Sequence, residues 1–216
     1  MHTAALTRRP DPRALRVATF GALALLAVVA FMHVLKPEME PTWRFVSEYA
    51  IGRLGWLMTL GFMAWAASAI ALSIAVRPVM TNAKGRAGAG LLTIVGIALV
   101  VAGIFRQDPV TSAPEQATTE GMMHALASMV GIPGIPIAAL LISSGLPAAR
   151  NTGAVRFAAH ATWISLALMI AYLAYAVPRA GGFNASVYAG VMNRLVVIAY
   201  IGWQLVLTRE LTRSGT

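Results

Sequence analysis

The chain has 216 residues, of which 58% are hydrophobic and only 12% are charged, and its formal net charge is +9. Soluble domains carry about twice that share of charged residues, so much of this protein's surface must face lipid. The positive charge lies in short segments between apolar stretches and accompanies no nucleic-acid-binding motif, so membrane lipids are expected partners and nucleic acid is not. The absence of cysteine excludes disulfides, thiolate catalysis and cysteine-ligated metals.

Six apolar stretches are long enough to cross a bilayer, because a hydrocarbon core of about 30 Å requires roughly 20 helical residues. In chain order they cover about 17–35, 54–76, 90–105, 122–144, 157–177 and 187–208. The sequence therefore predicts an all-α integral membrane protein, a bundle of about six transmembrane helices. The bundle forms one domain over 17–208, between a basic N-terminal segment, 1–16, and a short tail, 209–216.

The distribution of Lys and Arg predicts the orientation of the bundle. With the N-terminus inside, the cytoplasmic segments hold eleven such residues: Arg8, Arg9, Arg13, Arg16, Arg77, Lys84, Arg86, Arg150, Arg156, Arg209 and Arg213. The outer segments hold five: Lys36, Arg44, Arg53, Arg106 and Arg179. We therefore predict that both termini of this multi-pass membrane protein are cytoplasmic.

The outer segment after the first predicted helix carries the first candidate functional residues. Ser47, Glu48 and Tyr49 are followed by Gly55 and Trp56 at the start of the next helix. Glu48 is a candidate general acid or base, and Tyr49 and Trp56 are candidates for ligand contact. The alternative is that the two aromatic residues belong to the membrane interface and Glu48 is a solvated loop acid.

Asp108 and His124 flank the loop between the third and fourth predicted helices. Asp108 precedes a proline and is therefore extended or in a turn, from which its carboxylate can point back over the helix end; an ordinary turn role is the alternative. His124, in the first turn of the fourth helix, is a candidate for acid–base chemistry, and an interfacial histidine is the alternative. His33, near the outer end of the first helix, would join both if the helices enclose a common cavity.

Arg194 is the only charged residue inside a predicted transmembrane stretch, about 9 Å below its outer edge. A charge at the centre of a membrane helix costs about 2.5 to 3.5 kcal/mol on insertion scales and is usually functional. We predict that Arg194 faces the interior, pairs with Glu48 or Asp108, and donates to Tyr49 or an anionic ligand. The alternative is snorkelling to the headgroups. The adjacent Asn193 is a further candidate for ligand binding.

Pro133 and Pro136 lie in the middle of the predicted fourth helix. Each lacks an N–H group, which frees the carbonyls of Met129 and Ile132. We therefore predict a kink or an unwound turn between about Met129 and Ile135. Freed carbonyls in a membrane need partners or a wet cavity, and broken helices often mark ligand sites in transporters.

Several of these residues form short motifs that occur together in one known family. The motifs are Ser47-Glu48-Tyr49-Ala50 with Gly55-Trp56-Leu57-Met58, Phe105 with Asp108, Gly121 with His124, and Asn193-Arg194 before Trp203. Over about 22–207 the chain resembles the bacterial membrane proteins catalogued as domain of unknown function 998. The resemblance implies a bundle of six or so helices without an agreed activity, with motif positions at Glu48, Asp108, His124 and Arg194. Arg106 stands where that family usually has proline, so the turn before Asp108 departs from the usual pattern.

Together with the resemblance, these observations favour a protein of the bacterial inner membrane with an outward-facing polar pocket that binds, or acts on, a lipid or another small amphiphile. In an enzyme, Asp108 or Glu48 would be the acid or base and His124 its partner. The alternatives are a small transporter or proton-coupled carrier that uses the proline-containing fourth helix, and a non-catalytic membrane assembly subunit. The four histidines show no metal-ligand spacing, so no metal site is predicted. The sequence identifies no cofactor and no oligomeric state.

Overall fold

The computed structural model describes residues 9–148 and 152–213 of the chain. Within these residues all regular structure is helical, and six helices are long and apolar enough to cross a membrane, which confirms the predicted fold class. The long helices are α1 (Pro12–Leu35), α2 (Gly55–Val76), α3 (Ala83–Ile104), α4 (Thr119–Gly145), α5 (Gly153–Arg179) and α6 (Ala189–Arg213). Short 3-10 helices are η1 (Val46–Ala50), η2 (Arg77–Val79) and η3 (Pro114–Gln116). Arg8 and Arg150, and the outermost parts of both predicted flanking segments, lie outside the described residues.

Several helices begin before their apolar stretch, because polar residues cap their first turns. The carboxylate of Asp11 accepts a hydrogen bond from the Arg13 N–H at 2.9 Å and Pro12 occupies the first turn of α1. In α3 the amide oxygen of Asn82 accepts from the Gly85 N–H at 2.8 Å. The helices therefore extend beyond the hydrocarbon-spanning part of the sequence.

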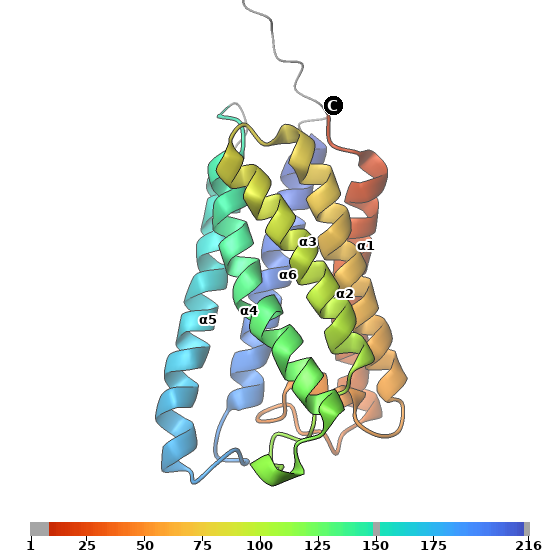
Figure 1. The fold of residues 1–216 in the computed structure, drawn as a ribbon, viewed down its shortest axis with the longest axis vertical. Coiled ribbons are helices and arrows are strands. Elements are labelled where there is room, and N and C mark those ends of the chain that lie inside the picture. The colour runs from red at the N-terminus through yellow and green to blue at the C-terminus, as the bar shows by residue number, and fades with distance from the viewer. Residues whose placement is uncertain (1–8, 149–151, 214–216) are drawn as a thin grey trace, which may run out of the picture.

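The six helices form a closed bundle in which consecutive helices run in opposite directions (Figure 1). Each helix packs against its neighbours in the chain, and α6 also packs against α1. The start of α1 and the end of α6 lie at the same end of the bundle, here called the terminal end. The opposite end, here called the long-loop end, carries the connections 36–54, 105–118 and 180–188.

Glycines allow α3 to approach both α2 and α4. A Cβ atom added at Gly88 would lie 2.7 Å from the Cβ of Leu141 in α4, and one at Gly96 would lie 2.5 Å from Cγ1 of Ile70 in α2. Such distances are too short for a real side chain. These glycines therefore serve helix packing, the usual role of small residues in membrane bundles.

Helix α5 is the least buried of the six, since only 28% of its most apolar 18 residues are buried. Its exposed side chains include Phe157, Ile164, Leu168 and Tyr175. An apolar surface of this extent is typical of a face that contacts lipid. α5 thus forms the outer wall beside α4 and α6.

Helix α4 is continuous from Thr119 to Gly145 with both prolines inside it, so the chain forms no unwound turn there, and the kink stays a prediction. Another helix replaces one of the missing donors. The Tyr200 hydroxyl in α6 donates to the carbonyl of Ile132 at 2.7 Å, and this is the carbonyl that Pro136 leaves free. A side chain of α6 therefore satisfies a backbone group that the proline frees, as membrane helices with proline require.

Candidate functional site

The predicted site residues lie near the long-loop end but form separate groups rather than one pocket. The groups are His33 with Tyr49 and Arg194, Glu48 with Arg44, Asp108 with Thr118, and His124 with the end of α3. Trp56, at the start of α2, is 60% exposed and belongs to none of them. An exposed tryptophan at a helix end fits the interface alternative better than ligand binding.

Glu48 is fully buried, so it is not the solvated loop acid that the alternative interpretation expected. One carboxylate oxygen forms an ion pair with Arg44 at 2.8 Å and accepts from the Val110 N–H at 3.1 Å. The other accepts from the Phe45 N–H at 2.8 Å. Glu48 therefore joins η1 to the α3–α4 loop, and both of its oxygens are occupied.

Asp108 organises the start of α4. Its two carboxylate oxygens accept from the N–H and the hydroxyl of Thr118, at 2.9 and 2.8 Å, and Thr118 in turn caps α4 by accepting from the Gly121 N–H at 3.0 Å. A negative charge at a helix N-terminus is stabilised by the helix dipole. A Cβ atom at Gly121 would overlap the Asp108 carboxylate, which explains the glycine at this motif position.

His124 is buried and bonds to the end of α3. Its Nδ1 lies 2.8 Å from the carbonyl oxygen of Ala102 and 3.0 Å from that of Phe105. Because carbonyls only accept, Nδ1 carries a proton and satisfies carbonyls that the end of α3 leaves free. No described residue bonds to Nε2, and the ring stands edge-on to Phe62 at 6.0 Å between centroids.

Arg194 does not form the predicted ion pair with Glu48 or Asp108; among the described residues it meets only neutral acceptors. Its guanidinium donates to the Arg44 carbonyl at 2.7 Å, and to the Tyr49 hydroxyl and His33 Nε2 at 3.0 Å each. The expected bond to Tyr49 is confirmed. The carboxylate of Glu48 is unavailable for direct pairing because Arg44, four residues earlier in the same loop, already holds it.

Lys36 is a buried cation; from the sequence it was counted among the outer Lys and Arg residues but was not a candidate site residue. It follows α1 directly, and its Nζ donates to the carbonyl of Tyr49 at 3.3 Å and to that of Ile51. Burial lowers the pKa of Lys36 below its usual 10.5, and the nearby charge of Glu38 opposes this shift. The only sequence signal for a buried Lys36 was its position, directly after an apolar stretch and before the motif that contains Tyr49.

A central cavity of about 80 Å³ lies between the helices, and residues of all six helices and η1 line it. That volume is several times the roughly 10–15 Å³ needed for one water molecule. Most of the lining is apolar, including Leu25, Phe62 and Ile135. Gly131 is buried in this lining, yet a Cβ added there would meet no atom within 4 Å, so the glycine directly faces the open space.

A groove of about 450 Å³ at the long-loop end adjoins the central cavity. Ser47, His124, Ser128, Ile132, Met169 and Asn193 line both spaces. Asp108 and Gln107 line only the groove. This groove, here called the mouth, therefore shares part of its lining with the cavity, and three predicted site residues, Asp108, His124 and Asn193, line it.

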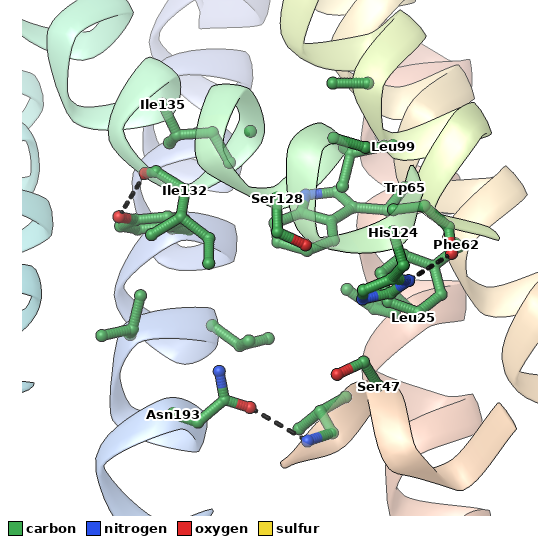
Figure 2. Close-up of a pocket in the computed structure, with 18 of the residues that line it drawn as sticks. Leu25, Ser47, Phe62, Trp65, Leu99, His124, Ser128, Ile132, Ile135 and Asn193 are labelled. Carbon is green, nitrogen blue, oxygen red and sulfur yellow. Dashed lines mark hydrogen bonds between the residues drawn. The ribbon is translucent and has the colours of Figure 1, made fainter. Parts of the chain in front are cut away.

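Figure 2 shows the polar groups of this mouth and the mostly apolar interior above them. The side-chain oxygen of Asn193 accepts from the Val46 N–H at 3.0 Å, so its amide nitrogen is the group directed away from that bond. Ser47 donates to the amide oxygen of Gln107, which leaves the Gln107 nitrogen free to donate. Ser128 lies four residues after His124 on the same helix face, a spacing that could have identified it from sequence.

The mouth is better arranged for binding than for the predicted acid–base chemistry. His124 contacts backbone carbonyls rather than a carboxylate, and the oxygens of Glu48 and Asp108 are bonded to other groups. Within residues 9–148 and 152–213, no three His, Asp or Glu side chains gather in a way that could hold a metal ion.

Comparison with known proteins supports the resemblance seen in the motifs. Residues 19–210 match the family described as protein of unknown function DUF998. No curated protein and no solved structure matches the chain significantly. The matched range includes Glu48, Asp108, His124 and Arg194, the four motif positions. Because the match extends over most of the sequence, the chain belongs to the DUF998 family of membrane proteins of unknown function.

Proposed function

We propose that the protein binds a small amphiphile, or one acyl chain of a lipid, with the hydrocarbon in the central cavity and the polar end at the mouth. The observation that carries this proposal is the shared lining of the two adjoining spaces, since His124, Ser128 and Asn193 line both. Typical ligand sites are mostly apolar with a few placed polar groups, and this combination matches the two-part chemistry of an amphiphile.

The polar groups at the mouth favour an uncharged headgroup. The amide nitrogens of Asn193 and Gln107 can donate hydrogen bonds, and Nε2 of His124 is free of protein partners in the described residues. Among the described residues that line the groove there is no Lys or Arg, whereas the carboxylate of Asp108 is present. The Asp108 carboxylate would therefore repel an anionic headgroup, and no cation in the lining would compensate for it. A hydroxyl, ester or amide headgroup carries no charge and would not be repelled.

The same proposal includes an orientation. Two of the eleven Lys and Arg residues predicted to be cytoplasmic, Arg8 and Arg150, lie outside the described residues. The other nine lie at or near the terminal end, whereas the five predicted outer Lys and Arg residues lie near the long-loop end. By the positive-inside rule the terminal end faces the cytoplasm. The mouth then opens at the outer leaflet of the bacterial inner membrane.

Titration of the purified protein with a fluorescent monoacylglycerol tests the proposal. The wild-type protein should bind it saturably and more tightly than the fatty acid of equal chain length. Gly131→Leu should weaken binding by on the order of tenfold or more, because its side chain would occupy the cavity. Gly202→Leu is the matched control: Gly202 also lies in a helix with no atom within 4 Å of an added Cβ, but it does not line the cavity.

Equal affinity of the wild type and Gly131→Leu would refute the cavity as the binding site, provided gel filtration shows both variants folded. Ala127→Leu fills the same cavity from one turn earlier and would replace Gly131→Leu if that variant misfolds. A preference for the fatty acid would refute the assignment of an uncharged head.

A further inference from the structure

A second groove lies outside the central cavity, between α1 and α6 near the long-loop end. It has a volume of about 510 Å³ and is lined by apolar side chains of both helices and by two polar residues, His33 and Arg194. Val46 and Val197 also line the central cavity, whereas His33 and Arg194 line this groove and not the cavity.

The charge of Arg194 is not neutralised by a bonded carboxylate. Besides its bonds to Arg44, Tyr49 and His33, the guanidinium donates to the carbonyl of its own helix at Gly190, 3.0 Å away. Glu48 attracts Arg194 from a distance, but its direct ion pair is with Arg44. Four of the five guanidinium N–H groups are used, which leaves one on Nη2 for a ligand.

His33 also presents no negative charge to Arg194. Its Nε2 accepts from Arg194, and its Nδ1 lies 2.6 Å from the carbonyl oxygen of Val29, so Nδ1 carries the proton and the ring is neutral. The ring of Tyr49 packs against that of His33 in a tilted arrangement, with 5.4 Å between the ring centroids. The groove therefore contains a half-buried cation whose hydrogen-bond partners among the described residues are all neutral.

The position of this cation points to the lipid headgroup region. Arg194 is five residues from the start of α6, about 7.5 Å along the helix axis. The adjacent surfaces of α1 and α6 expose Phe31, Val34, Leu195 and Ile198, an apolar surface suited to acyl chains. Arginine in such a place is stabilised by phosphate, which its planar guanidinium recognises well.

We propose that this groove is a binding site for an anionic phospholipid, whose phosphate contacts Arg194 and whose acyl chain lies along α1 and α6. The lipid phosphate supplies the direct ionic partner that Arg194 lacks among the described residues. This site is separate from the proposed amphiphile cavity in both location and charge preference.

Native mass spectrometry of the protein released from mixed-lipid nanodiscs measures this preference. The wild type should retain one phosphatidylglycerol in preference to phosphatidylcholine with the same acyl chains, by on the order of tenfold. Ala30→Phe should abolish the preference, because Ala30 is exposed and lines the groove without bonding to Arg194. Ala27→Phe, at an exposed alanine three residues earlier that does not line the groove, should behave as wild type.

Arg194→Lys keeps the charge but loses the planar donor set, so it should keep the preference in weakened form. Equal retention of the two lipids by the wild type, or an unchanged preference in Ala30→Phe, would overturn the assignment. Gly131→Leu should leave phosphatidylglycerol retention unchanged, so failure of the cavity proposal and failure of the groove proposal are distinguishable.

Discussion

Replacing Tyr200 by phenylalanine removes one hydroxyl and leaves the carbonyl of Ile132 without a donor. In a regular helix that carbonyl would accept from the N–H of residue 136, which is Pro136 and has none. Leaving a buried backbone group unsatisfied costs about 1–3 kcal/mol, whereas interhelical side-chain hydrogen bonds in membranes average about 0.6 kcal/mol. Because Pro136 removes the usual helical donor of this acceptor, we expect Tyr200→Phe to lower the free energy of unfolding by about 1–2 kcal/mol.

A double-mutant cycle identifies the cause of this loss. Pro136→Ala restores an N–H four residues after Ile132, so Tyr200→Phe should have almost no effect in that background. The measurement is reversible unfolding in mixed micelles by SDS titration, followed by circular dichroism. Ser143→Ala is the control, since that buried hydroxyl bonds to Ala139, whose carbonyl can keep its own helical donor. Strictly additive losses would refute the argument that Tyr200 replaces the donor missing at Pro136.

Two further predictions concern the long-loop end. Burial lowers the pKa of Lys36 in the folded protein below its usual 10.5. Between the lowered pKa and 10.5 the unfolded chain therefore binds more protons than the folded one, so the contribution of Lys36 to stability rises with pH in this range. Lys36→Met should remove that rise in pH-dependent SDS unfolding; an unchanged pH profile would contradict it. Gly121→Ala should destabilise the fold by about 1–3 kcal/mol through overlap with Asp108, whereas Gly90→Ala, where space is open, should not. Equal melting temperatures of these two variants would exclude this role of Gly121.

The sequence by itself determined the architecture and the locations of the motif residues. Six long apolar stretches can be satisfied in lipid only as helices, because the backbone must hydrogen-bond internally there. The motifs were sufficient to identify the family, and Arg194 stood out because charge in a membrane helix is costly. Stretch length, short motifs and a charge within an apolar stretch are local properties of the chain, so a single sequence is enough to recognise them.

Only the tertiary structure decided which groups meet. Glu48 was expected to pair with Arg194, but the nearby Arg44 holds Glu48, and Arg194 bonds to neutral acceptors instead. The prolines predicted a break or kink in α4, but the helix is not broken, because a tyrosine from α6, more than sixty residues later in the chain, supplies a donor. The central cavity likewise depends on all six helices at once. Which side chains pair, and where a cavity remains, depends on the packing of distant segments to within about an ångström. Neither hydropathy nor motif spacing encodes those distances.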